Sequence, residues 1–203
     1  IMSHVHLTQV QRFSAEKAHA YRLLAAEGFA ALEEPAVAGV IDLVRISNAN
    51  ALQVYTDAYA EEYLNGKDAR TLREAFARIQ ETSDLTAALA EQAFGFLRAR
   101  VLLCERREGV FGALAISRRI ATAALRFSQG IGRTLEPVMN TFNDYDLQIY
   151  NGDVGFLWET QGRRSVVFQT PEGGFRIVEA DRLRGAETAY AMTIHKSQGS
   201  EYE

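Results

Sequence analysis

The sequence predicts an α/β fold into which a small β-barrel is inserted. Two observations indicate the α/β class: an apolar run at residues 101–104 leads through a glycine-containing loop into a helical pattern, and a second apolar run follows Thr188. The third observation is a change of character at Gly130. From about residue 133 to residue 183 the helical period disappears, and short β-rich runs alternate with turns.

The N-terminal residues are expected to begin the α/β part. Residues 4–10 alternate enough for a short strand, and Ser14 is well placed as the N-cap of a helix that reaches about Glu34. Residues 40–46 are typical of a second strand.

Three helical stretches follow, each defined by apolar residues at helical spacing. Asn65 and Gly66 are expected to end the first of them. The tyrosines of these helical stretches are interpreted as core residues rather than as part of a ligand-binding site. The apolar stripes are Leu52/Tyr55/Tyr59/Tyr63, Leu72/Phe76/Ile79 and Leu85/Ala88/Leu89/Phe96.

Residues 101–104 form a continuous apolar run, as expected for a strand that is buried on both faces. The loop 108–112 then leads into a helix over about residues 113–127, with Ile116, Ile120 and Phe127 directed inward. A glycine loop before a helix can bind phosphate, but the spacing G-x-x-x-x-G-K-[ST] occurs nowhere in the chain. We therefore expect no phosphate-binding loop in this sequence.

The β-rich region is expected to be a closed barrel, because curling a small sheet removes its exposed edges. Tight connections are predicted at Gln161-Gly162 and at residues 171–174. The predicted strands cover residues 135–141, 154–160, 165–170 and 175–180. The predicted domains are residues 1–130, the inserted barrel at 131–184, and a return to the first domain at 185–203.

Composition restricts the class of protein. The 203 residues are 47% hydrophobic and 24% charged, which is typical of globular domains. The single cysteine, Cys104, excludes an internal disulfide, and no apolar run reaches the ~20 residues of a membrane span. We expect a cytoplasmic protein without a membrane partner. The chain begins at Ile1 and stops at Glu203 within an expected element, so it is interpreted as a fragment of a longer protein.

A net charge of −4 argues against binding nucleic acid through a general basic surface. Any contact with DNA must then be local. The candidate local cations are Arg118, Arg119, Arg126, Arg133, Arg163, Arg164 and Lys196.

Residues 189–201 concentrate hydroxyl, imidazole, ammonium and amide groups more densely than any other stretch. In one interpretation they are a buried element followed by a polar turn that Gly199 ends. However, the run T-I-H-K-S-Q-G-S-E-Y resembles, without a gap, motif V of superfamily 1 helicases, particularly their RecD-like branch. This resemblance implies a RecA-like second motor domain.

Two further stretches resemble the same family. N-D-Y-D-L-Q-I-Y-N-G-D-V-G, at residues 143–155, resembles the segment that lies in the SH3-like barrel of RecD proteins. From the residues alone, Asn143 and Asp144 can cap a turn, and Asn151-Gly152 permits a tight reversal. The stretch R-R-E-G-V-F-G, at residues 106–112, resembles the one those proteins carry after a buried strand.

The resemblance also implies site residues. Residues 7–13 resemble motif IV, in which Arg12 would reach the γ-phosphate of ATP as an arginine finger does; the alternative is a surface arginine at a strand end. Gln198, Gly199 and Glu201 would face the nucleotide. Single-stranded DNA would be contacted by Thr193, His195 and Lys196. One short element would then couple ATP state to DNA binding. No metal ligand is expected, because the histidines lack ligand spacing.

The implied function is that of the RecD subunit of exodeoxyribonuclease V, an ATP-dependent 5′ to 3′ DNA helicase that acts in double-strand-break repair with RecB-like and RecC-like partners. ATP and Mg²⁺ would be the cofactors of the whole protein. The P-loop and the magnesium-binding acid are missing here, so this fragment alone is not expected to bind or hydrolyse ATP.

Two alternatives remain open. The first is a stand-alone RecD-like helicase that works without RecB or RecC. The second is a non-catalytic module whose barrel binds protein or single strands, with Phe142, Tyr145, Tyr150 and Trp158 as material for an aromatic groove.

Overall fold

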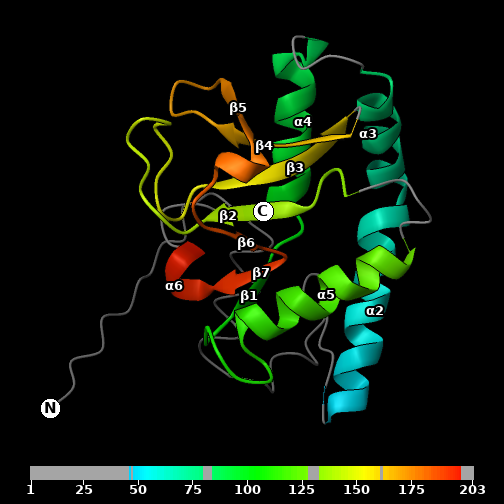
Figure 1. Ribbon diagram of the computed structural model, residues 1–203. Helices are drawn as coiled ribbons and strands as arrows, with labels where there is room; N and C mark the ends of the chain where they lie inside the picture. The colour runs from blue at the N-terminus through cyan, green and yellow to red at the C-terminus, as the bar shows by residue number, and fades with distance from the viewer. Residues whose placement is uncertain (1–45, 47, 80–83, 128–132, 161, 198–203) are drawn as a thin grey trace, which may run out of the picture. The chain divides into compact units, whose positions relative to one another are not determined.

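The computed structural model describes residues 46, 48–79, 84–127, 133–160 and 162–197 (Figure 1). All of these except residue 46 lie in one compact unit. The strand predicted at residues 4–10, the helix predicted from Ser14 to about Glu34, and residues 40–45 of the second predicted strand fall outside the described residues.

Helices α2 (Ala49–Asn65) and α3 (Lys67–Ala77) meet at Gly66. The side chain of Asn48 caps α2, because its Oδ1 accepts a hydrogen bond from the backbone N–H of Ala51 at 2.9 Å. The helix ends at Gly66, whose N–H donates to the carbonyl of Glu62 at 2.8 Å. The predicted end of the first helix is confirmed.

Helix α4 (Ala87–Arg98) begins at Thr86, whose hydroxyl accepts from the N–H of Leu89 at 3.3 Å. The predicted apolar stripe is wrong at Ala88, which is exposed in the first turn of the helix. The buried face is instead made by Ala90, Ala93, Phe94, Phe96 and Leu97. Leu85 is buried as predicted, but it precedes the helix.

Strand β1 (Leu102–Cys104) pairs in parallel with β7 (Ala191–Thr193), with Leu102 opposite Ala191. Helix α5 (Ala113–Phe127) follows β1 and packs on this pair and on α2 (Figure 1). Because parallel strands need a crossover connection, strand, helix and strand form a βαβ unit. The predicted α/β class is confirmed.

The expectation that β1 is buried on both faces is wrong at Leu103, which is 49% exposed. Side chains alternate along a strand. Leu102 and Cys104 pack with Ala113 and Ile116 of α5, so Leu103 points to the opposite face.

Five antiparallel strands lie between α5 and β7 in the sequence. They form one sheet with the order β5-β4-β3-β2-β6. In chain order they are β2 (Pro137–Asn140), β3 (Val154–Thr160), β4 (Arg163–Gln169), β5 (Phe175–Glu179) and β6 (Ala186–Thr188), with a short 3₁₀ helix, η3 (Ala180–Arg182), after β5. Strand β3 has the predicted bounds.

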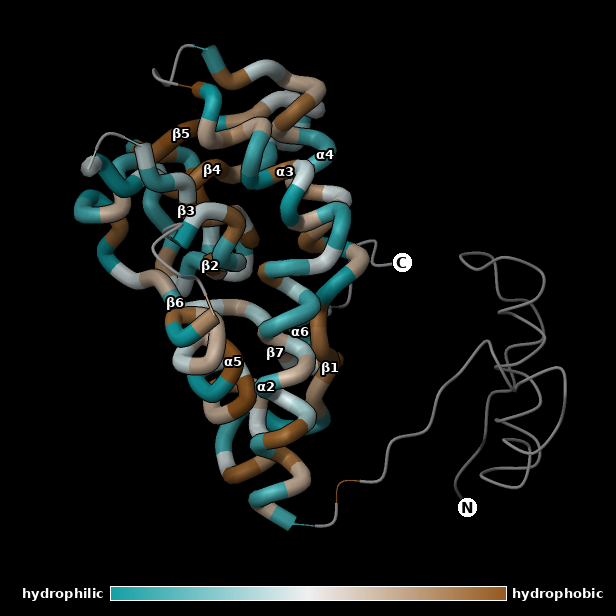
Figure 2. The backbone as a smooth tube through the Cα atoms, turned by 90° about the vertical axis from the view of Figure 1, so that its right-hand side faces the viewer, coloured by the Kyte–Doolittle hydropathy of each residue, from teal (hydrophilic) through white to brown (hydrophobic). Residues whose placement is uncertain are grey.

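The sheet and the helices share one hydrophobic core. The ring of Phe156 in β3 lies 5.3 Å from that of Phe76 in α3 and 5.3 Å from that of Phe94 in α4, measured between centroids. Trp158 lies 5.9 Å from Phe76. Figure 2 shows hydrophobic stretches along β4 and β5, and helix α4 contacts the sheet at β3. Tyr63 is buried in the same core, as predicted for the tyrosines of α2.

Candidate functional site

The polar run that starts at Thr193 begins where the chain leaves the core. Residues 189–192 are buried, whereas Thr193 is half-buried and His195 is exposed. Strand β7 ends at Thr193, and the short helix α6 (Ile194–Ser197) follows at once. Three predicted DNA-contacting residues, Thr193, His195 and Lys196, are therefore brought together at one strand end.

This strand end lies beside that of β1, because the two strands are parallel and Thr193 is opposite Cys104. Ligands of open α/β sheets bind at the carboxyl ends of the parallel strands. Thr193 and α6 occupy this edge, next to the loop that follows β1 (Figure 1).

Local contacts fix the shape of α6. The hydroxyl of Thr193 accepts from the backbone N–H of Lys196 at 3.3 Å, and the hydroxyl of Ser197 donates to the carbonyl of Ile194 at 2.8 Å. The ammonium of Lys196 lies 3.7 Å from the sulfur of Met139 in β2. Lys196 therefore links the segment after β7 to the antiparallel sheet.

The resemblance assigns four residues to the nucleotide. Arg12, Gln198, Gly199 and Glu201 lie outside the described residues. Their placement stays a prediction.

A buried serine that the sequence did not single out holds β7 in place. Ser117 of α5 is 2% exposed, and its Oγ accepts from the N–H of Ala191 at 2.9 Å and donates to the carbonyl of Ala191 at 3.1 Å. Tyr190, the preceding residue, instead bonds β1, because its carbonyl accepts from the N–H of Leu102 at 3.0 Å. The sequence signal that could have identified Ser117 is its position as a polar residue on the apolar face of a predicted helix.

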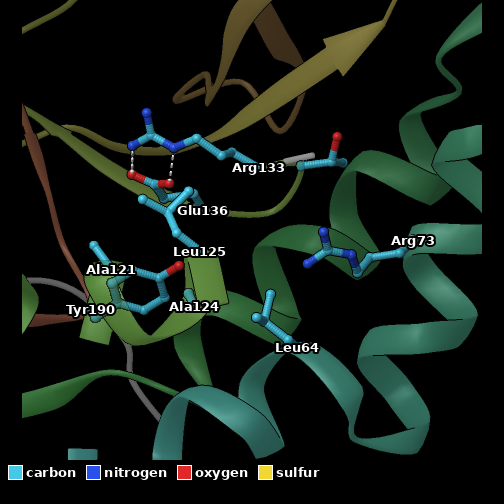
Figure 3. Close-up of a pocket in the computed structure, with 9 residues that line it drawn as sticks. Leu64, Arg73, Ala121, Ala124, Leu125, Arg133, Glu136 and Tyr190 are labelled. Carbon is cyan, nitrogen blue, oxygen red and sulfur yellow. Dashed lines mark hydrogen bonds and ion pairs between the residues drawn. The ribbon is translucent and has the colours of Figure 1, made fainter. Parts of the chain in front are cut away.

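A buried carboxylate, Glu136, joins the two places where the chain enters and leaves the antiparallel sheet. It forms a bidentate pair with the guanidinium of Arg133, with Nε to Oε2 at 2.5 Å (Figure 3). It also accepts from the hydroxyl of Thr188 at 3.1 Å. The hydrogen bond to Glu136 raises the pKa of Arg133. A charged residue inside a predicted β-run was the signal for this cluster.

A small pocket opens beside this pair. Arg73 of α3 and Tyr190 line it, together with Leu64, Ala121, Ala124 and Leu125 (Figure 3). Burial lowers the pKa of Arg73 and raises that of Tyr190. The space holds about one water molecule, so the pocket does not fit a nucleotide.

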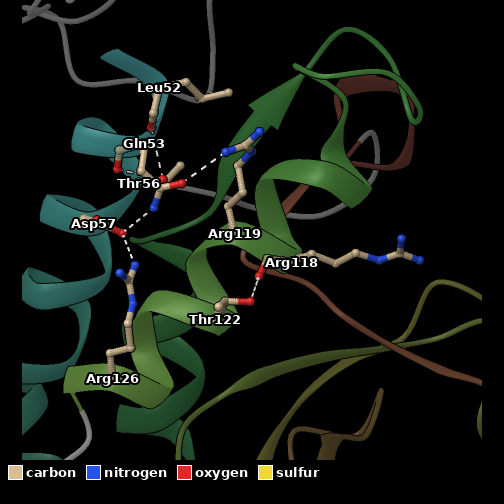
Figure 4. Close-up of polar contacts among 8 residues, drawn as sticks. All are labelled: Leu52, Gln53, Thr56, Asp57, Arg118, Arg119, Thr122 and Arg126. Atoms are coloured by element: carbon tan, nitrogen blue, oxygen red, sulfur yellow. Dashed lines mark hydrogen bonds and ion pairs between the residues drawn. The ribbon is translucent and has the colours of Figure 1, made fainter. Parts of the chain in front are cut away.

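Several of the candidate cations are engaged within the fold. Arg126 pairs with Asp57 at 2.6 Å, and Arg119 donates to Gln53 at 3.1 Å, so both hold α5 against α2 (Figure 4). Arg164 pairs with Asp181 at 3.3 Å. Arg118 is exposed and points away from α2. Lys196 remains the candidate that stands at the strand end.

Within the described part of the chain, no group of three or more His, Cys, Asp or Glu side chains could hold a metal ion. Cys104 is buried, and burial raises the pKa of its thiol. Among the described helices, none is long and apolar enough to cross a membrane.

The loop from residue 141 to residue 153 is capped as its sequence predicts. The N–H of Leu147 donates to Oδ1 of Asp144 at 2.9 Å, and the N–H of Asn151 donates to Oδ1 of Asn143 at 2.8 Å. Gly152 has a φ of 100° at the reversal, a conformation that favours glycine.

A scan against known protein families matched none. Among curated proteins, the chain is 38% identical over 134 residues to "RecBCD enzyme subunit RecD" of Mycobacterium tuberculosis, covering 62% of the chain and 22% of that protein. It is 31% identical over 177 residues to the protein of the same name from Mycolicibacterium smegmatis, covering 81% of the chain and 30% of that protein.

A shorter match joins the chain to "ATP-dependent RecD2 DNA helicase" of Deinococcus radiodurans, with 32% identity over 78 residues, 38% of the chain and 11% of that protein. The chain spans less than a third of the length of these curated relatives. The resemblance to RecD-like proteins that the three sequence stretches indicate is confirmed.

Proposed function

Because the chain is similar to RecD proteins over most of its length, we propose that it is part of an ATP-dependent DNA helicase of the RecD type. In this proposal the described residues belong to a RecA-like second motor domain, and the antiparallel sheet is its inserted SH3-like barrel. The whole protein would unwind DNA in the 5′ to 3′ direction during double-strand-break repair, with RecB-like and RecC-like partners.

The observation that carries the proposal is the position of the run T-I-H-K-S. It starts at the carboxyl end of a buried parallel strand and becomes exposed at once, which suits a segment that meets a ligand. Thr193, His195 and Lys196 would contact single-stranded DNA with a hydroxyl, an imidazole and an ammonium group. Such local contacts fit a chain whose net charge is −4.

Arg12, Gln198, Gly199 and Glu201 would form one wall of the ATP site in the whole protein. Bound ATP and Mg²⁺ would supply the phosphoryl transfer that drives translocation. Arg12 would stabilise charge on the γ-phosphate, while Glu201 would accept from a ribose hydroxyl. Since the polar run contains the DNA-contacting residues and also Gln198, Gly199 and Glu201, it would couple the two ligands.

The test is the ATPase activity of the full-length protein with single-stranded DNA. We expect DNA to stimulate turnover, and we expect Arg12→Ala to abolish turnover while ATP still binds. Arg70→Ala, which removes an exposed arginine of α3, is the matched control and should leave turnover unchanged. Unchanged turnover in Arg12→Ala would contradict the role of the arginine, and absence of any DNA-stimulated ATPase would contradict the helicase proposal.

The similarity to a RecD2 helicase supports a second candidate, a helicase that works without RecB or RecC. Purification of the full-length protein from its own cells distinguishes the two. Stoichiometric co-purification of two large subunits favours the RecBCD-like complex, whereas an active single chain favours the stand-alone enzyme.

A further inference from the structure

The loop between β2 and β3 carries three exposed aromatic side chains. Phe142 is 57% exposed, Tyr145 73% and Tyr150 45%. The rings of Tyr145 and Tyr150 lie edge to face, with their centroids 6.2 Å apart. A cluster of exposed aromatic rings on one loop marks an interaction surface. We name residues 142–153 the aromatic loop.

The aromatic loop is anchored to the core of the sheet. Ile149 is 1% exposed and packs with Leu157 and Val166. Asp144 and Ile149 exchange two backbone hydrogen bonds, at 2.7 Å and 3.0 Å. The exposed rings therefore project from a loop whose own backbone is paired.

Side chains from neighbouring strands hold the same loop. Arg176 of β5 donates to the carbonyls of Leu147 at 2.5 Å and Gln148 at 2.8 Å. Asn140 of β2 donates to the carbonyl of Tyr150 at 3.1 Å. Because these bonds fix the loop in advance, little conformational entropy remains to be lost when a partner binds.

The charge of the aromatic loop restricts the partner. It contains three aspartates, Asp144, Asp146 and Asp153, and no lysine or arginine. Asp144 and Asp153 accept backbone hydrogen bonds within the loop, whereas Asp146 is exposed. Carboxylates repel phosphate groups, so the loop is poorly suited to nucleic acid, and they attract guanidinium groups.

We propose that the aromatic loop binds a basic, partly apolar segment of a partner protein. An arginine of that segment would stack on Tyr145 or Tyr150 and pair with the carboxylate of Asp146. Rigid tyrosines flanked by Asn and Gly are also the chemistry that antibody paratopes use to bind proteins. This inference does not depend on the helicase proposal.

The test measures binding of labelled peptides to the full-length protein by fluorescence anisotropy. One peptide alternates arginine with leucine, and a second alternates glutamate with leucine. We expect the arginine peptide to bind more tightly, and Tyr145→Ala to weaken its binding about thirtyfold, as the loss of an interface hot spot does. Asp146→Lys should reverse the preference in favour of the glutamate peptide.

Phe111→Ala is the matched control, because Phe111 is 54% exposed in a different loop and should not affect either peptide. Thermal unfolding of each variant verifies that it folds. Equal binding of both peptides, or binding that Tyr145→Ala and Asp146→Lys leave unchanged, would overturn the proposal. Displacement of the arginine peptide by oligothymidylate, together with Tyr145-dependent binding of that oligonucleotide, would assign the loop to nucleic acid instead.

Discussion

The hydroxyl of Ser117 takes the place of a neighbouring β-strand beside Ala191, because it accepts a hydrogen bond from the N–H of that residue and donates one to its carbonyl. The two residues are 74 positions apart, on α5 and β7. The backbone N–H and carbonyl of Ala191 point away from β1, so without the serine these buried groups would have no hydrogen-bond partner from that strand. The hydroxyl thus allows β7 to be buried beside a helix and fixes the strand two residues before Thr193.

Ser117→Ala should destabilise the protein by about 1–3 kcal/mol, because it leaves two buried backbone groups unsatisfied. Thr122→Ala is the control on the same helix: its hydroxyl bonds the exposed turn at Arg118, and its loss should cost less than ~0.5 kcal/mol. Urea unfolding of both variants compares the free energies. Equal values would show that the Ser117 bonds contribute nothing.

Glu136→Gln should cost about 1–3 kcal/mol, because it removes the charge that pairs with Arg133 while Glu136 is only 6% exposed. The exposed pair of Arg164 with Asp181 gives the control, and Asp181→Asn should change stability by less than ~1 kcal/mol. Denaturant midpoints measure both. If Glu136→Gln left the free energy of unfolding unchanged, Thr188 and Arg133 would be held by other contacts.

Two glycines should respond to alanine in opposite directions. A Cβ on Gly155 would overlap the carbonyl oxygen of Val167 in the paired strand, so Gly155→Ala should destabilise by about 1–3 kcal/mol. A Cβ on Gly95 would meet only Arg98, at 4.0 Å, so Gly95→Ala should stabilise α4 by about 0.5–1 kcal/mol. Thermal unfolding gives the sign of each change, and like signs would contradict the prediction.

Stability should fall steeply above about pH 10. Burial raises the pKa of Tyr59, Tyr63 and Tyr190 above the ordinary value of 10.0, so the folded state keeps protons that the unfolded state releases. Their contribution is intact below the unfolded pKa and is lost as pH rises through the folded pKa.

Tyr190→Phe provides the check, because it removes one of these buried ionisable groups. Above pH 10 the free energy of unfolding of the variant should fall less steeply with pH than that of the parent, by up to about 1.4 kcal/mol per pH unit. Urea unfolding at a series of pH values measures the slope. Superimposable curves would mean that Tyr190 does not resist ionisation.

If the segment after β7 contacts DNA phosphate, Lys196→Ala should weaken binding of oligothymidylate by the full-length protein. For single strands, each lost phosphate contact makes the negative slope of log affinity against log salt shallower by about 0.7. Lys67→Ala, at the exposed start of α3, should leave the slope unchanged. A slope in Lys196→Ala equal to that of the parent would remove the lysine from the DNA contact.

The local elements could be predicted because their signals are local. Asn65-Gly66 ended α2, and alternation with turn residues gave β3 its bounds. Leu103 was wrongly expected to be buried, because the four-residue apolar run at 101–104 does not reveal how many layers cover the strand. Ala88 was wrongly placed in the core, because helical spacing alone does not tell where the helix starts.

In the candidate site, too, some residues could be predicted from the sequence and others could not. Thr193, His195 and Lys196 were found because they are consecutive in a recognisable run. Ser117 and Glu136 were not, since their roles depend on partners at Ala191 and Thr188, which lie 74 and 52 positions further along the chain. Only the three-dimensional topology brings such pairs together.

The rings of Phe76, Phe94, Phe156 and Trp158 meet across the boundary between helices and sheet, and this has a consequence for how the chain can be dissected. A truncation that ends after α5 would expose Phe76 and Phe94 to water, while the excised sheet would expose Phe156 and Trp158. Neither half would keep a closed core. Helices and sheet should therefore melt in a single cooperative transition, and expression of either part alone should give aggregates.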